Sequence, residues 1–142
     1  MWAIQGDLNE PSAALSSPEW SGFDAAIISM ALHHVADPAA FLVQLRQRVR
    51  RGGSLVIVDW LRDTEAPDRA NEEADPKYRE GDMLRLPEGM SIWPGFSARE
   101  VGAIVAAAGC ADVEVRVYPE PIETPAEMQG YDRMFIARAT VL

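Results

Sequence analysis

A chain of 142 residues, of which 48% are hydrophobic and 25% charged, suits a single globular domain with a buried core. The net charge of −9 argues against a nucleic-acid partner, and the single cysteine, Cys110, excludes an intrachain disulfide and is expected to be a small buried residue. Because the sequence shows no signal peptide and no apolar run near the roughly 18 residues of a membrane helix, we expect no membrane partner and a cytoplasmic location.

The first part of the chain contains two predicted strands. Trp2–Leu8 is expected to be a short strand that ends in an acidic turn, and a connecting loop rich in Pro, Ser and Gly follows it. In the stretch "FDAAIISMALHHVADP", the residues Ala25–Ser29 are apolar through Ile28. An unbroken apolar run of this length predicts a strand that is covered on both faces, as in a parallel sheet.

A capped helix and a second apolar strand come next. Asp37 and Pro38 suit the cap and the first position of a helix, and Gly52 is predicted to end that helix in a left-handed cap. The inward stripe of the helix is predicted to consist of Phe41, Leu42, Leu45 and Val49. Ser54–Trp60 is then a continuously apolar strand with Asp59 at its carboxyl end. A strand, a helix and a strand in this order predict a right-handed βαβ unit with parallel strands.

The segment Arg62–Pro94 has many acidic residues and prolines and little regular pattern. A stretch of this kind inside a compact domain is typical of a lid or a binding loop, although part of Ala70–Gly81 is compatible with a helix. The apolar candidates for an acceptor pocket are Trp60, Tyr78, Met83, Met90 and Trp93. Ordinary packing is the alternative for each of them taken singly.

The last third of the chain predicts one helix and two strands. Ser97 and Glu100 have the spacing of a capping box, and Gly109 suits the end of the helix that follows. The stretch "DVEVRVYP" alternates, which predicts a half-buried strand with three valines on one face: Val113, Val115 and Val117. Arg133–Thr140 is the last predicted strand.

Four stretches of the chain, in this order, carry a resemblance to a known family. They are "GDL", "FDAAIISMALHHVADP", "LRQRVRRGGSLVIVDW" and "GFSAREVGAIVAAAGCADVEV". Together they resemble the carboxyl half of class I S-adenosylmethionine-dependent methyltransferases, particularly the small-molecule, type 11-like enzymes. The resemblance covers nearly all of the chain. It implies an α/β fold of one domain, residues 1–142: a truncated Rossmann-like methyltransferase fold with a mostly parallel sheet, an antiparallel last strand, flanking helices and a lid-like insertion over residues 62–94.

The resemblance also implies a cofactor, S-adenosylmethionine, and positions that contact it. Asp7 is expected to accept a hydrogen bond from the adenine amino group, with the backbone N–H of Leu8 near a ring nitrogen, and Ser29 and Met30 are expected to line the methionine side. A turn residue that caps its own loop is the alternative for Asp7, and strand termination is the alternative for Ser29. The expected contacts to a small-molecule substrate are Asp59, Trp60 and Trp93.

The two histidines of the chain, His33 and His34, are adjacent on the loop after Ala25–Ser29. Either of them is a candidate catalytic base, because the imidazole pKa lies near neutral pH. The alternative is that the pair packs the loop against the sheet. A zinc site needs three or four ligands at suitable spacing, and the sequence has no Cys/His cluster, so we expect no metal.

The chain departs from the family at its start. No G-x-G-x-x-G loop occurs in the sequence, and Met1 aligns just before the family's third strand, so two strand–helix units of roughly 60 residues are expected to be missing. Their absence is expected to leave Ala25–Ser29 as an open sheet edge. That edge can pair with a second copy, with a separate chain, or with Trp2–Leu8, and a mispredicted gene start is a further explanation.

These features leave two functional hypotheses. The first is a methyltransferase that acts on a small molecule with S-adenosylmethionine and needs a second chain or copy, such as a homodimer, to complete the fold. The second is a non-catalytic remnant that serves as a dimerisation or accessory subunit. A dinucleotide-dependent oxidoreductase is disfavoured, because it too needs the glycine loop.

Overall fold

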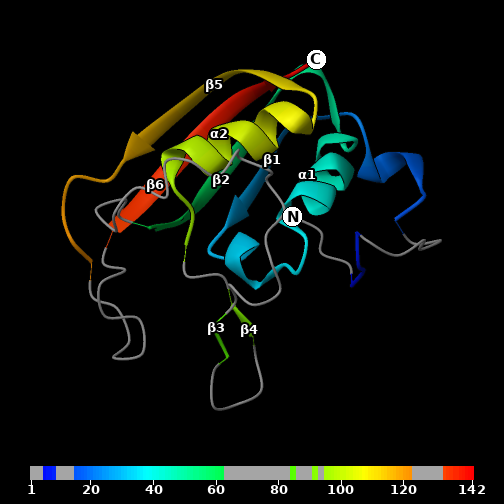
Figure 1. Ribbon diagram of the computed structural model, residues 1–142. Coiled ribbons are helices and arrows are strands. Elements are labelled where there is room, and N and C mark those ends of the chain that lie inside the picture. Colours follow the sequence, from blue (N-terminus) through cyan, green and yellow to red (C-terminus); the bar gives the residue numbers. More distant parts are fainter. Residues whose placement is uncertain (1–4, 9–14, 63–83, 86–90, 93–94, 123–132) are drawn as a thin grey trace.

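The computed structural model describes residues 5–8, 15–62, 84–85, 91–92, 95–122 and 133–142 (Figure 1). The elements in chain order are η1 (Pro18–Trp20), β1 (Phe23–Ser29), η2 (Leu32–His34), α1 (Pro38–Arg46), β2 (Val49–Leu61), β3 (Leu84–Arg85), β4 (Ser91–Ile92), α2 (Ala98–Ala107), β5 (Cys110–Val117) and β6 (Arg133–Val141). Of the segment Arg62–Pro94 the structure describes Arg62 and the short antiparallel pair β3–β4. The predicted lid and its residues Tyr78, Met83, Met90 and Trp93 otherwise lie outside the described residues.

The main sheet has the strand order β1-β2-β6-β5. β1 and β2 are parallel, whereas β6 is antiparallel to both of its neighbours, β2 and β5. Three of the four strands therefore run in one direction and the last strand in the chain runs against them. This topology confirms the predicted Rossmann-like architecture with an antiparallel last strand.

Both helices lie on the same side of the sheet (Figure 1), and the core lies between them and the strands. The predicted inward residue Leu42 of α1 is fully buried, as are Val101, Ile104 and Val105 of α2. Cys110 is buried at the start of β5, as predicted. Within the described residues, no helix is both long and apolar enough to cross a membrane.

The two predicted N-terminal helix caps are confirmed. Asp37 accepts a hydrogen bond from the backbone N–H of Ala40 at 2.9 Å, and Pro38 is the first residue of α1. At α2 the hydroxyl of Ser97 and the carboxylate of Glu100 each accept from the other's backbone N–H, at 3.2 and 2.7 Å. Each cap satisfies a donor that the helix itself leaves unpaired, which typically contributes about 1 kcal/mol.

The predicted end of the first helix is wrong. α1 ends at Arg46, and Val49 is the first residue of β2, where it is buried opposite Phe23. Gly52 does adopt the left-handed conformation, with φ +73°, but it lies within β2 and not at a helix cap. Between the pairs Phe23–Val49 and Ala25–Ser54 the register shifts, because β2 contains extra residues that bulge out of the ladder. Pairing with β1 thus overrides the local cap signal.

The prediction that Ala25–Ser29 is covered on both faces is also wrong. We define the uncovered face as the side chains that point away from the helices: Ala25, Ile27 and Ser29 of β1, Val56 and Val58 of β2, and Ile136 of β6. Ile27 is 68% exposed and Ile136 is 46% exposed. Neither described helix packs on this face, so its apolar centre is open to solvent.

β1 is an outer strand of the described sheet, and its only described partner is β2. The strand predicted over Trp2–Leu8 is not observed in residues 5–8, which form coil and a turn, and residues 2–4 lie outside the described part of the chain. In the described residues, the predicted pairing of this segment with β1 is therefore not seen.

Candidate functional site

The carboxyl ends of the parallel strands β1 and β2 lie side by side. Ser29 is in register with Val58, and the N–H of Met30 donates to the carbonyl of Val58 at 2.8 Å. The η2 loop leaves β1 at this point, and Asp59 and Trp60 follow Val58 on β2. Ligands of open parallel sheets bind at the carboxyl ends of the strands, so this is the candidate site.

A buried hydrogen bond between a histidine and a carboxylate joins the loop to the sheet at this site. Nδ1 of His33 lies 2.6 Å from Oδ1 of Asp59, and the two side chains are 6% and 0% exposed. The Asp59 carboxylate also accepts from the backbone N–H of His33 at 3.2 Å and from that of Trp60 at 2.8 Å. Three hydrogen bonds to one buried carboxylate hold the η2 loop against the end of β2.

The contact with Asp59 also determines what the His33 ring can do. A carboxylate only accepts hydrogen bonds, so Nδ1 of His33 carries the proton that it shares with Asp59. The lone pair of a neutral ring then lies on Nε2. His33 is thus oriented like the base of a catalytic dyad, and the same contact performs the loop packing that the sequence left as the alternative.

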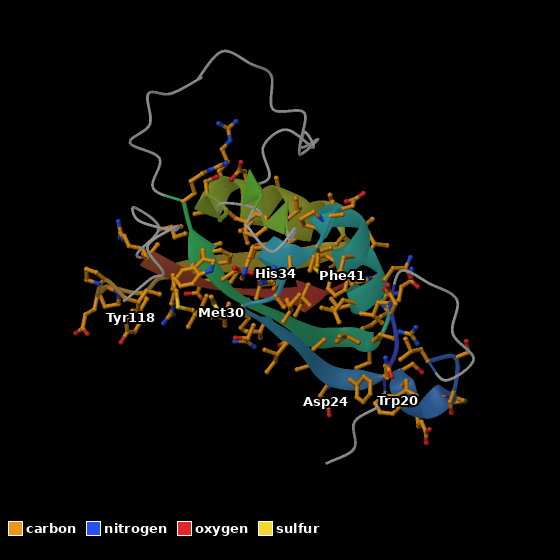
Figure 2. The ribbon with its side chains drawn as sticks, turned by 90° about the horizontal axis from the view of Figure 1, so that it is seen from below. Trp20, Asp24, Met30, His34, Phe41 and Tyr118 are labelled. Carbon is orange, nitrogen blue, oxygen red and sulfur yellow. The ribbon has the colours of Figure 1, made fainter. Side chains whose placement is uncertain are left out.

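His34, labelled in Figure 2, is exposed, and its ring centroid lies 4.1 Å from that of the buried His33. Partial desolvation lowers the pKa of His34 below the usual 6.5; the nearby His33 lowers it further, and Asp59 opposes both effects. His34 is therefore neutral at pH 7. The ring of Trp60, which is largely buried, lies 6.5 Å from that of His33.

The structure brings six of the predicted site residues together and places Leu8 apart from them. Leu8 lines an apolar hollow of about 310 Å³ with Trp20 and Phe23, beside the first half of β1. That hollow lies towards the end of β1 opposite to Ser29, so Leu8 is not grouped with the others. Asp7 is exposed next to Leu8, and Trp93 lies outside the described residues. The six residues that meet at the carboxyl ends of β1 and β2 are Ser29, Met30, His33, His34, Asp59 and Trp60.

Sequence reasoning named His33 and Asp59 but did not predict that they form a pair. They are separated by 26 residues, and the contact exists because β1 and β2 are adjacent and parallel. The signal that could have found it is topological: a polar residue at the carboxyl end of each strand of one βαβ unit. Among the described residues, no group of three or more His, Cys, Asp or Glu is arranged to hold a metal ion.

Comparison with known proteins shows the family to which the chain belongs. A family model described as "Methyltransferase domain" matches residues 4–115. The chain belongs to this family of methyltransferase domains. The match includes the βαβ unit, the His33–Asp59 pair and helix α2. No curated protein matches the chain by sequence.

Solved structures share the fold at low sequence identity. The 1,6-didemethyltoxoflavin-N1-methyltransferase of Burkholderia thailandensis, solved with 1,6-didemethyltoxoflavin and S-adenosylhomocysteine bound, has a TM-score of 0.65 and 16% identity over 97% of this chain and 49% of its own. A SAM-dependent methyltransferase of Methanosarcina mazei has a TM-score of 0.59 and 19% identity over 86% and 60%. A possible histamine N-methyltransferase of Thermotoga maritima has a TM-score of 0.53 and 19% identity over 86% and 57%. The chain therefore spans about half to three fifths of the length of these relatives.

Proposed function

We propose that this methyltransferase domain binds S-adenosylmethionine and transfers its methyl group to a small molecule, and that a second chain or a second copy completes its cofactor site. The observation that carries the proposal is the buried His33–Asp59 pair beside Ser29 and Met30, at the carboxyl ends of two parallel strands. A base held by a carboxylate at the expected ligand end of a methyltransferase fold suits an acceptor that must lose a proton.

The residues of the chain have distinct roles in this proposal. Bound S-adenosylmethionine supplies a methyl group on a positively charged sulfur, so the protein mainly has to position the acceptor and exclude water. Nε2 of His33 takes the proton of the acceptor hydroxyl, amine or acidic C–H group. Asp59 holds the ring and stabilises the imidazolium that forms, and Trp60 excludes water from the inner side. A positioned base of this kind typically contributes 10²–10⁴-fold in rate.

The residues present fit one flank of the cofactor. Ser29, Met30 and the η2 loop offer backbone groups at the strand ends, but the described sheet stops at β1, directly beside them. The sequence has no G-x-G-x-x-G loop. The described residues therefore provide only one flank of the cofactor site.

The second candidate function is a non-catalytic accessory or dimerisation subunit. The open edge of β1 and the exposed apolar residues of the uncovered face favour it, because such surfaces bind protein partners. It differs from the first candidate in one measurable property: an accessory subunit needs no cofactor.

A cofactor titration tests the proposal. S-adenosylhomocysteine is added to the nitrogen-15-labelled chain, and amide and indole resonances are followed by NMR. Shifts of Ser29, Met30, His33 and the Trp60 indole, with dissociation in the range of about 100 μM or weaker for a one-flank site, are the expected result. S-adenosylmethionine serves as the matched ligand and ATP as the control for adenine binding alone. Shifts confined to other residues, or none at millimolar ligand, contradict the proposed cofactor site.

A further inference from the structure

Met30 follows β1 in a backbone conformation that is unfavourable for its residue type. Its φ is +51°, in the left-handed region, where Cβ crowds the following carbonyl oxygen. Asp112, the other described non-glycine residue with positive φ, is of a type that tolerates this region, and it lies at the register shift of β5. The remaining described positions with positive φ are all glycines: Gly22, Gly52, Gly95 and Gly109. Met30 has neither advantage, so the surrounding structure has to impose its conformation.

Contacts on both sides of Met30 impose this conformation. The N–H of Met30 donates to the carbonyl of Val58 at 2.8 Å, which joins the end of β1 to β2. Leu32, two residues further along the chain, is fully buried. The N–H of His34 donates to the carbonyl of Ala31 at 3.1 Å and closes the η2 turn. The left-handed residue is therefore held between a paired strand and a loop that is anchored in the core.

The turn at Met30 determines where His33 lies along the sheet. Ser29 is in register with Val58, so Asp59 lies one strand position beyond this level. If the chain continued as a strand, His33 would lie about 10 Å past Asp59, because each strand position spans about 3.3 Å. Instead the N–H of His33 donates to Oδ2 of Asp59 at 3.2 Å, and Nδ1 of the ring lies 2.6 Å from Oδ1. The chain therefore has to turn sharply between Ser29 and His33, and Met30 is the first residue of that turn.

We propose that Met30 is a positioning residue of the candidate site, and that its left-handed turn places the His33 ring on Asp59. The backbone conformation has this effect, so glycine at this position can replace methionine and a β-branched residue cannot. The inference deepens the proposed function and rests on it in one respect, because His33 is the base in that proposal. The contact between His33 and Asp59 can be measured without a cofactor or an acceptor, so a failed cofactor titration and a failed positioning role are told apart.

Nuclear magnetic resonance of the cofactor-free chain, with nitrogen-15 in its backbone and histidine rings, tests the role of Met30. In the wild type, the neutral His33 ring is expected to hold its proton on Nδ1, because the buried Asp59 carboxylate accepts it. In Met30→Val the left-handed turn is less favourable, so we expect a mixture of both ring tautomers and at least about tenfold faster exchange of the His33 amide. Met30→Gly removes the crowding by Cβ and is expected to keep the Nδ1–H tautomer and to slow that exchange by about threefold.

Asp112→Val is the matched control. It also places valine at a left-handed position, with φ +52° in the wild type, but this position lies in β5, and β2 and β6 separate β5 from β1. The variant is expected to lower the urea midpoint, as Met30→Val does, and to leave the tautomer of His33 unchanged. The comparison separates a general loss of stability from a displacement of the His33 ring.

Faster amide exchange or a mixture of tautomers in Met30→Gly overturns the inference, because the methionine side chain and not the turn would then hold the loop. Unchanged exchange in both Met30 variants overturns it as well, and so does loss of the Nδ1–H tautomer in Asp112→Val. If Met30→Val does not fold, slower exchange in Met30→Gly supports the role of the turn, and an unchanged or faster rate contradicts it.

Discussion

The carboxylate of Asp59 depends on hydrogen-bond partners within the protein, because it has no contact with solvent. It is fully buried and accepts three hydrogen bonds, two from His33 and one from the N–H of Trp60. Burying a charge is unfavourable unless partners replace the lost water, and here they come from the loop after β1 and from β2 itself. The same residue that stabilises the loop therefore orients the candidate base.

Replacement of Asp59 tests its structural role. Asp59→Asn keeps the size but removes the charge that binds His33, so we expect a loss of about 2–4 kcal/mol in the free energy of unfolding. Asp24→Asn is the control: it changes an exposed ion pair with Arg50 and is expected to cost less than about 0.5 kcal/mol. Urea denaturation measures both. Equal losses in the two variants contradict the assignment.

His34 predicts a pH dependence. Its pKa is lowered in the folded chain, so the unfolded chain takes up the proton first as the pH falls through the usual 6.5. Stability is full above that value, decreases below it, and becomes constant with respect to this group once the pH passes the folded-state pKa. His34→Gln is expected to flatten this part of the profile, measured as the urea midpoint from pH 8 to pH 5. A variant profile parallel to that of the wild type would show that another group is responsible.

The elements follow local signals except where strand pairing opposes them. The Asp37 and Ser97 caps were predictable, because they depend on contacts within a few residues. The bulge at Gly52 was not, because its left-handed conformation serves the pairing of β2 with β1 and looks the same in sequence as a helix cap.

Two glycines test this difference: Gly53 lies in β2 beside β1, and Gly102 lies within α2. A Cβ on Gly53 would lie 2.8 Å from the carbonyl oxygen of Asp24 and 2.5 Å from Cγ1 of Val49, so Gly53→Ala is expected to destabilise the chain by about 1–3 kcal/mol. A Cβ on Gly102, within α2, meets nothing within 4 Å, and Gly102→Ala is expected to stabilise by about 0.5–1 kcal/mol. Thermal and urea denaturation measure whether each variant is more or less stable than the wild type. Destabilisation by Gly102→Ala would contradict the open surroundings.

At the scale of the whole molecule, the described helices cover one face of the sheet, and no described strand pairs with the outer edge of β1. For a dimerisation subunit, the second candidate function, association contributes to stability and the urea midpoint depends on protein concentration. For a dimer that dissociates on unfolding, each tenfold rise in concentration is worth about 0.7 kcal/mol per chain. Ile27→Lys is expected to abolish the dependence, and a midpoint independent of concentration in the wild type would count against dimerisation.

The amino-acid order by itself determined the N-terminal helix caps, the apolar strands and the parallel βαβ unit, because each depends on residues close in the chain and on a strong periodic pattern. It also placed His33, Asp59, Ser29 and Met30 at strand ends. Only the tertiary structure decided that His33 and Asp59 form one buried pair, that Leu8 lies away from them, and that Ile27 faces solvent. These outcomes depend on which strands become neighbours and which face the helices cover, and contacts between distant segments determine both.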